Sequence, residues 1–568
     1  MNAEATFKKE DIVGREMKFG TYIASSDEKH DVIFVKEYVT LKDGQRIPQL
    51  TPVVDYKRKF WITQDAYRNH QEKKEWEDLN KLMEFKSTQV LLAQTVSAAM
   101  GVPGAKRTLR QWTRSPYLYG TDISITSLLK NDYQQRWPAY KTPISTVAVM
   151  DIETTTDEGN YPHCLSLTFG SRCVIAIHKN FLKGVFEPEV KLRKCFQEQL
   201  GEVIIKRNIR LEVVFVDSIT EMCSEVFKRA HVWKPDFVTI WNMSFDLRVL
   251  ERWVNSEGGS WVDIVSDPSV PPKLRYYHFE VGDETKKSAS GKEEKLAPAA
   301  RWHIVTCTAS FQFVDSMCIY YRLRMAEGIL PGGYNLDNVL KTNGVGGKLK
   351  FDVKADSGLQ WHRIMQADHP IEYLVYNLWD CISVEVLDEK TQDLRMVIEA
   401  QCGLSDYSRL KTNPGKTVDD LHFFALENKK VISTFPGSRD DENDEMVVDR
   451  NEWICTLPSH LMAPVGLHVL EEIPTLATEV CKHVADLDIE GTYPNVQAGL
   501  NIGKETTHRE VGPIDGLDEY WKRSIGVNLT AGIINCIEIG MTGFNLPSPE
   551  KVLELFEQHL TLQAQNSA

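Results

Sequence analysis

The 568-residue sequence has no long apolar segment. Because a bilayer-spanning helix needs a run of roughly 18 or more apolar residues, we expect no membrane span and no membrane partner. The first residues are polar and contain no apolar stretch of the signal-peptide kind. The eleven cysteines include no C-x-x-C pair, which argues against a structural zinc site or a disulfide framework. These absences predict a protein of the reducing cytoplasm.

An excess of basic residues is also missing. Lysine and arginine number 66 against 80 aspartate and glutamate residues, which gives a net charge of −14 at pH 7. That balance excludes a small protein that grips nucleic acid with its whole surface. It leaves room for a large enzyme whose positive charge is gathered in one groove. At roughly 100–200 residues per domain, the length predicts three or four domains.

Breaks in composition divide the sequence into regions. A Thr-Pro pair at 142–143 precedes a strongly apolar segment, residues 283–295 are polar, and residues 439–445 form an acidic run. Polar stretches with nothing to bury are typical of loops and boundaries. We therefore predict an N-terminal mixed α/β module over residues 1–140 and a central domain over 141–402, with a C-terminal region beyond it.

The central region has the clearest pattern of alternating elements. Ser218 and Glu221 form a capping box that predicts a helix through about His231, and a second helix is expected over 247–255. A long helix is predicted from Pro370 to about Gln401. Short apolar, β-branched segments predict strands over 146–152, 164–169, 173–177, 211–216 and 237–241. Three meander strands followed by helix, strand and helix are the order of a ribonuclease-H-like α/β domain.

Four carboxylates lie at the ends of these predicted elements. Asp151 and Glu153 end the first strand, and its period of two places both side chains on one side. Asp246 follows a later strand, where a loop enters a helix. Tyr376 and Asp380, four residues apart on the long helix, share one helical face.

This set of residues suits hydrolysis of a phosphodiester. Two divalent cations, Mg²⁺ or Mn²⁺, held about 3.5–4 Å apart by carboxylates can activate water and stabilise the leaving oxygen. A phenol such as that of Tyr376 can orient the attacking water. A plainer interpretation is that strand-end aspartates cap helices and that Tyr376 is a half-buried helix residue. The order of all four carboxylates on suitable elements favours the catalytic interpretation.

These residues resemble the three exonuclease motifs in the proofreading domain of family B DNA polymerases. The patterns D-x-E, N-x(2–3)-F/Y-D and Y-x(3)-D occur here from Asp151 to Glu153, from Asn242 to Asp246 and from Tyr376 to Asp380. The resemblance implies a metal-dependent 3′–5′ exonuclease in which Asp151, Glu153, Asp246 and Asp380 hold two ions. Asn242 and Phe245 would then contact the DNA strand.

Two further features extend the resemblance to the T-even phage branch. The segments 274–281 and 302–306 could form the β-hairpin found between the second and third motifs, although a surface loop is an equal alternative. Residues 488–495 resemble the first palm motif, D-x-x-S-L-Y-P-S. By that resemblance Asp488 would bind catalytic metal, and Tyr493 would lie under the incoming sugar. The Ser, Leu and final Ser of the motif are replaced here by Gly491, Thr492 and Asn495.

The rest of a polymerase is missing from the sequence. Neither the fingers pattern K-x(3)-N-S-x-Y-G nor a D-T-D segment follows the palm-like motif. The resemblance therefore implies a partial palm over 483–568, joined through a connecting segment over 403–482 that packs on the N-terminal domain. Without a second palm carboxylate, nucleotidyl transfer should fail in this chain alone.

Several functions remain open at this point. The favoured one is the proofreading portion of a replicative polymerase that is completed by a second chain. We expect it in the cytoplasm, which is the host cytoplasm if the protein is viral. Its expected partners are single-stranded DNA 3′ ends, primer–template DNA, that second polymerase chain and a sliding clamp. The alternatives are a stand-alone exonuclease with a vestigial palm, an inactive DNA-binding scaffold of a replisome, and a ribonuclease of the same superfamily.

Overall fold

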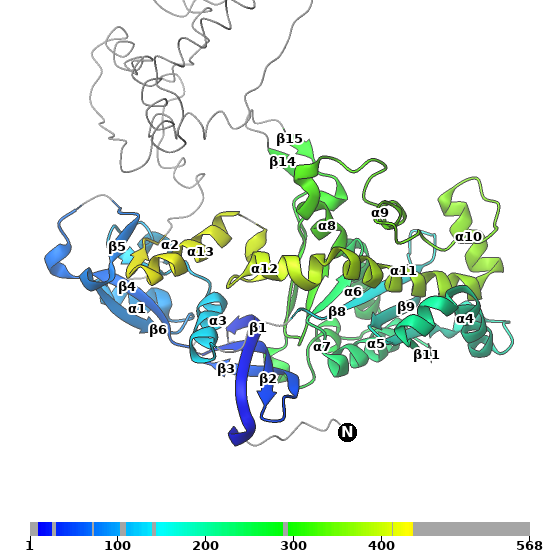
Figure 1. Cartoon of the computed structure of the whole chain (residues 1–568), viewed down its shortest axis with the longest axis horizontal. Coiled ribbons are helices and arrows are strands. Elements are labelled where there is room, and N and C mark those ends of the chain that lie inside the picture. The colour runs from blue at the N-terminus through cyan, green and yellow to red at the C-terminus, as the bar shows by residue number, and fades with distance from the viewer. Residues whose placement is uncertain are drawn as a thin grey trace, which may run out of the picture. The chain divides into compact units, whose positions relative to one another are not determined.

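The computed structural model describes residues 9–24, 30–70, 73–102, 109–138, 144–287, 293–411 and 413–434 (Figure 1). All of them belong to one compact unit, Met1–Val447, and a second unit comprises Val448–Ala568. The palm-like segment, with Asp488 and Tyr493, lies outside the described residues. Among the described residues, no helix combines the length and the apolar character needed to cross a membrane.

The N-terminal module is built from short antiparallel sheets and helices. Its first sheet is a meander of three strands, and its helix α3 (Ile125–Arg136) packs on β1. Met17, Ile33 and Val35 of that sheet and Ile125 and Leu129 of the helix form a buried cluster. The remaining elements of the module are β1 (Ile12–Ala24), β2 (Asp31–Leu41), β3 (Arg46–Val54), β4 (Arg58–Thr63), β5 (Trp76–Asp78), β6 (Leu82–Ser87), α1 (Leu92–Ala99), α2 (Leu109–Trp112) and β7 (Leu118–Tyr119).

A six-stranded mixed sheet forms the centre of the next region. The strand order is β11-β10-β9-β8-β12-β17. Strand β9 is antiparallel to both β8 and β10, whereas β12 is parallel to both β8 and β17. The strands are β8 (Val147–Thr154), β9 (Pro162–Phe169), β10 (Arg172–His178), β11 (Arg210–Val216), β12 (Phe237–Ile240) and β17 (Gln312–Asp315). The fold is therefore mixed α/β, as the sequence predicts.

Helices cover both faces of this sheet, and the strands alternate between the two cores. Met150 and Ile152 of β8 pack in a cluster with α5 and α6, whereas Val149 packs against α11. Because side chains alternate along a strand, Asp151 and Glu153 share the face of Val149. The helices of this region are α4 (Pro188–Arg207), α5 (Ile219–Trp233), α6 (Met243–Ser256), α7 (Trp261–Val265), α8 (Ser316–Arg324), α9 (Leu336–Thr342), α10 (Gly358–Asp368) and α11 (Pro370–Thr391).

Two predicted elements can now be compared with the structure. Strands β13 (Tyr277–Glu280) and β16 (Ile304–Cys307) pair antiparallel, so the segments 274–281 and 302–306 contain paired strands, with β14 (Thr285–Lys287) paired to β15 (Glu293–Lys295) beyond them. The prediction of a single helix from Pro370 to about Gln401 is wrong. It breaks at Gln392, whose φ is 60°, and a π-helical turn (Asp393–Val397) and α12 (Ile398–Cys402) follow.

The chain returns to the N-terminal module after α12. Strand β18 (Lys430–Ile432) pairs with β5, and α13 (Asn413–Glu427), in yellow, lies beside the module in Figure 1. The buried carboxylate of Asp419 on α13 accepts hydrogen bonds from Ser127 and Arg409. These contacts join residues 413–434 to the first 136 residues of the chain.

Buried charges join the N-terminal module to the central sheet. Lys36 on β2 is fully buried, and its Nζ donates to the backbone oxygen of Lys234 at 2.7 Å and lies 3.8 Å from the carboxylate of Asp236. Asp236 also accepts from Tyr38 at 3.1 Å and from Thr146 at 2.9 Å. Burial lowers the pKa of Lys36 to about 8. The ammonium group therefore depends on these oxygens to remain charged in the interior.

This network predicts a large effect of removing Asp236. Because Asp236→Ala leaves Lys36 buried without its carboxylate, we expect a loss of about 3–5 kcal/mol of unfolding free energy. Asp217→Ala is the matched control. Asp217 pairs with Lys179 on the surface, where an ion pair contributes about 0–1 kcal/mol. Urea denaturation of both variants measures the difference, and equal losses would contradict this account of the interface.

Candidate metal centre

Three carboxylates meet at one end of the central sheet. Asp151 and Glu153 extend from the end of β8, and Asp380 comes from the middle of α11, which covers that face. One oxygen of each lies within 4.8 Å of the others. Asp380 is 3 % exposed, whereas Asp151 and Glu153 are partly exposed. The predicted strand parity and the predicted helix face thus bring these three groups together.

Asp246 lies close to this group without joining it. It stands in the first turn of α6, whose N-cap Asn242 has a left-handed backbone with φ of 73°. The side chain of Asp246 is 6 % exposed, and its Oδ2 has no hydrogen-bond partner among the described residues. Its negative charge contributes to the raised pKa of Asp151. The fourth predicted carboxylate is therefore near the centre but outside the tight cluster of three.

Two side chains of α11 hold the strand carboxylates in place. Asn377 is fully buried and donates from Nδ2 to Asp151 Oδ2 at 2.7 Å, while its amide oxygen accepts from Ser166 of β9. Tyr373 donates its hydroxyl hydrogen to Glu153 Oε2. Both carboxylates thus receive a directed hydrogen bond from the same helix that carries Asp380.

Lys348 supplies the positive charge of the centre. Its Nζ lies 2.5 Å from Asp380 Oδ2 and 2.8 Å from the hydroxyl of Tyr376. Burial alone would lower the pKa of Lys348, but Asp380 and Tyr376 raise it above its ordinary value. Lys348 therefore stays protonated and offsets part of the negative charge around it. Asp380 Oδ1, by contrast, is buried without a partner among the described residues.

Simultaneous ionisation of all the carboxylates is unfavourable in this buried centre. Burial raises the pKa of Asp151 well above its usual range, and Asp246, Asp380 and Glu153 raise it further. Burial also raises the pKa of Glu153 to about 7, despite the hydrogen bond from Tyr373. A divalent cation would favour the ionised form of each group. The electrostatics therefore favour cation binding.

A groove runs along α6, the helix that carries Asp246. It has a volume of about 660 Å³ and is lined by Asn242, Phe245, Arg248 and Arg252, among others. Phe245 is 41 % exposed. Asn242 and Phe245, which the sequence predicts to contact substrate, thus line one groove, and Phe245 directly precedes Asp246 in the sequence.

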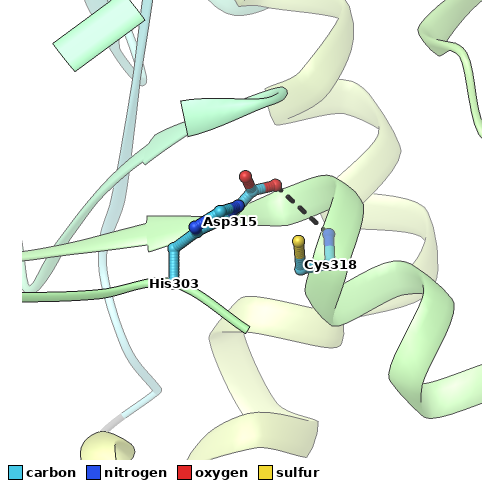
Figure 2. A group of neighbouring side chains, drawn as sticks. All are labelled: His303, Asp315 and Cys318. Carbon is cyan, nitrogen blue, oxygen red and sulfur yellow. Dashed lines mark hydrogen bonds between the residues drawn. The ribbon is translucent and has the colours of Figure 1, made fainter. Parts of the chain in front are cut away.

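A second group of potential metal ligands lies at the start of α8. His303, Asp315 and Cys318 are all buried, and one ligand atom of each lies within 4.8 Å of the others (Figure 2). The carboxylate of Asp315 already accepts backbone N–H bonds from Met243 at 2.8 Å, Met317 at 3.0 Å and Cys318 at 3.2 Å. Asp315 therefore caps α6 and α8 together, which is a structural role.

The other two members of that group are also engaged. Cys318 Sγ lies 2.6 Å from the backbone oxygen of Arg301, and burial raises the pKa of its thiol well above its usual range. His303 Nδ1 accepts the backbone N–H of Gly282 at 3.1 Å. Because a metal binds thiolate rather than thiol, this donor set fits a metal less well than the carboxylates do.

Several residues of the centre were not predicted from the sequence. Lys348 lies in an irregular segment between α9 and α10, where no periodic pattern exists to mark it. Tyr373 and Asn377 are four residues apart, and each is within one turn of the predicted Tyr376 and Asp380. That spacing was a usable signal, because residues at i and i+4 share a helical face.

No protein-family model matches the chain, and no curated protein matches it. A fold by itself hosts many unrelated activities. The function therefore has to come from the residues, distances and charges of the centre.

The two groups of ligands predict different responses to mutation. We expect the chain to bind Mn²⁺, and Asp380→Ala to weaken that binding by at least about 10²-fold, since even partners of ligands are worth about 10- to 100-fold. Cys318→Ala, in the other group, should leave the affinity unchanged. Isothermal titration with Mn²⁺ measures both variants. Loss of binding in Cys318→Ala alone would assign the metal to the second group.

Proposed function

We propose that this chain is a metal-dependent 3′–5′ DNA exonuclease on a ribonuclease-H-like domain. One observation carries the proposal: Asp151, Glu153 and Asp380 converge within 4.8 Å at the end of the central strand β8, with Asp246 nearby. The three carboxylates come from strand β8 and helix α11, which are far apart in the sequence. This argues against a local helix-capping arrangement. Hard carboxylate oxygens of this kind are the preferred ligands of Mg²⁺ and Mn²⁺.

The sheet topology supports the fold part of the proposal. A ribonuclease-H-like domain is expected to begin with three meander strands, and β8, β9 and β10 are neighbours that pair antiparallel in chain order. Strand β12 lies on the other side of β8 and is parallel to it. The additional strand β11 lies at the edge, parallel to β10. Asp151 and Glu153 then lie on β8, between β9 and β12.

The residues of the centre fit a divalent cation. Asp246 Oδ2 and Asp380 Oδ1 are buried oxygens without partners among the described residues, and leaving such groups unsatisfied costs free energy. Asp151, Glu153 and Asp380 would hold one ion, and Asp246 would contribute to a second. When bound, such ions supply an activated water and charge stabilisation for the leaving oxygen.

The remaining groups have separate tasks. Because Lys348 donates to the hydroxyl oxygen of Tyr376, the hydroxyl hydrogen of Tyr376 is left to orient a water molecule. Lys348 also offsets charge next to Asp380. Asn377 and Tyr373 keep Asp151 and Glu153 oriented. The proposed chemistry therefore needs preorganised carboxylates and one oriented water.

The groove along α6 suits a single strand with an unpaired 3′ end. Arg248 and Arg252 are exposed there and lie one helical turn apart, which suits successive phosphates. The exposed ring of Phe245 suits stacking with a base. We therefore propose that the substrate enters along α6 with its terminal phosphodiester at the carboxylates.

The polymerase part of the proposal rests on the sequence alone. The motif around Asp488 and Tyr493, outside the described residues, supports a relationship to family B polymerases. The exonuclease would then proofread for such a polymerase, with primer–template DNA and a sliding clamp as further partners. The intact carboxylates favour this activity over an inactive scaffold.

A labelled DNA strand tests the exonuclease. With Mg²⁺ and a 5′-labelled strand, we expect a ladder shortened from the 3′ end, and no extension when dNTPs are added. Asp151→Ala should lower the rate by about 10²-fold or more, because it removes several kcal/mol of metal-dependent stabilisation. An untouched strand would remove the catalytic assignment, and faster cleavage of RNA would indicate a ribonuclease.

The groove gives a second prediction. Phe245→Ala should raise KM for single-stranded DNA by about 5- to 150-fold, since stacking on an aromatic side chain is worth about 1–3 kcal/mol per base. Phe424→Ala is the matched control, because Phe424 is also exposed but lies on α13. Steady-state exonuclease kinetics compare the two. Equal KM values would place the strand elsewhere.

A further inference from the structure

Tyr373 is a second tyrosine at the metal centre, outside the three exonuclease motifs. It lies one turn before Tyr376 on α11, is 1 % exposed, and donates its hydroxyl hydrogen to Glu153 Oε2. The two tyrosine rings are parallel, with centroids 6.0 Å apart. Tyr376 points its hydroxyl to Lys348 instead. The two phenols therefore have different partners, a carboxylate for Tyr373 and an ammonium group for Tyr376.

Helix α10 supplies two hydrogen-bond donors to the hydroxyl of Tyr373. Gln366 Nε2 lies 3.2 Å from that hydroxyl and 2.8 Å from the backbone oxygen of Thr154. Because a backbone oxygen can only accept, the contact with Thr154 fixes the orientation of the Gln366 amide. The NH₂ group of Gln366 therefore donates to Tyr373.

His362 completes the arrangement. Its Nδ1 lies 2.8 Å from the Tyr373 hydroxyl. The hydroxyl has one hydrogen, and an ionised Glu153 can only accept it, so Tyr373 must accept from both Gln366 and His362. His362 then carries its hydrogen on Nδ1. The chain of bonds runs in one direction, from α10 through Tyr373 to Glu153.

The same contacts anchor α10 to the end of β8. Gln366 bridges Thr154 and Tyr373, and Arg363 Nε donates to Thr156 at 3.1 Å. Thr154 directly follows Glu153 on β8. Both the backbone and the side chain at the end of β8 are thus held by α10.

We propose that Tyr373 is a positioning residue that fixes the Glu153 carboxylate for a divalent cation, with His362 and Gln366 of α10 as its support. This inference rests on the proposed function and adds to it a tyrosine that the motifs do not contain. Groups that hydrogen-bond to a metal ligand orient it and raise its affinity for the ion. Tyr373 acts through Glu153 and contacts neither substrate nor water in this role.

Mn²⁺ binding without DNA tests the proposal directly. Tyr373→Phe keeps the buried ring and removes the hydroxyl, so we expect the Mn²⁺ affinity, measured by electron paramagnetic resonance, to fall by about 10- to 100-fold. Tyr376→Phe is the matched control and should bind Mn²⁺ like the wild type while lowering kcat. In Tyr373→Phe, excess Mn²⁺ should restore kcat.

A second variant separates positioning from damage to the fold. His362 is only partly buried, with 35 % of its side chain exposed, so His362→Ala should fold and lower the Mn²⁺ affinity by a smaller factor. Because His362 acts through Tyr373, the double variant should bind Mn²⁺ no more weakly than Tyr373→Phe alone. If the losses of Mn²⁺ affinity in the two single variants were additive in the double variant, His362 would not act through Tyr373, and the proposed chain of hydrogen bonds would be overturned.

The outcomes distinguish this proposal from the function on which it rests. Wild-type Mn²⁺ affinity in Tyr373→Phe, with folding verified by circular dichroism, would overturn the positioning role even if the wild type degrades DNA. A wild type that neither binds Mn²⁺ nor degrades DNA would overturn the proposed function, and the positioning role with it. Weaker Mn²⁺ binding by Tyr373→Phe but not by Tyr376→Phe is the supporting result.

Discussion

Repulsion among carboxylates is the constraint on which this centre depends. Asp151, Glu153 and Asp380 are held within 4.8 Å, and burial strengthens their mutual repulsion. A chain tolerates such a group only if neighbouring donors offset part of the charge. Lys348 is the charged donor, and α11 adds the amide of Asn377. The packing of α11 on β8 therefore sets the positions of Asp151, Glu153 and Asp380 relative to one another.

Some of this arrangement could be predicted from the sequence, because it depends on local periodicity. The two-residue period of β8 places Asp151 and Glu153 on one face, and the i, i+4 spacing aligns Tyr376 with Asp380. Lys348 could not be predicted, because its contact with Asp380 joins an irregular segment to a helix. The end of α11 was missed for a related reason: the carboxylate of Asp388 accepts the backbone N–H of Leu394 at 2.7 Å, across the turn at Gln392.

The predicted domain boundary near residue 140 is another feature that the sequence describes only in part. Composition marks a break there, yet Lys36 from one side and Asp236 from the other are both buried in a shared network. Long-range charge pairing of this kind leaves no pattern in a single sequence. Its effect is to fix β2 of the N-terminal module against the end of α5 and the start of β12. The scaffold that carries the centre thus includes residues from both sides of that boundary.

The proposed substrate is an anionic polymer, so an acidic chain would need local positive charge to bind it. The net charge of −14 gives no general attraction for DNA. Within the described residues, Arg248 and Arg252 line the α6 groove and Lys348 adjoins Asp380. Bound divalent cations would reverse the sign of the carboxylate cluster itself. Under the proposed function, the ions that take part in hydrolysis would also attract the phosphodiester, so substrate binding and cleavage should both depend on the metal.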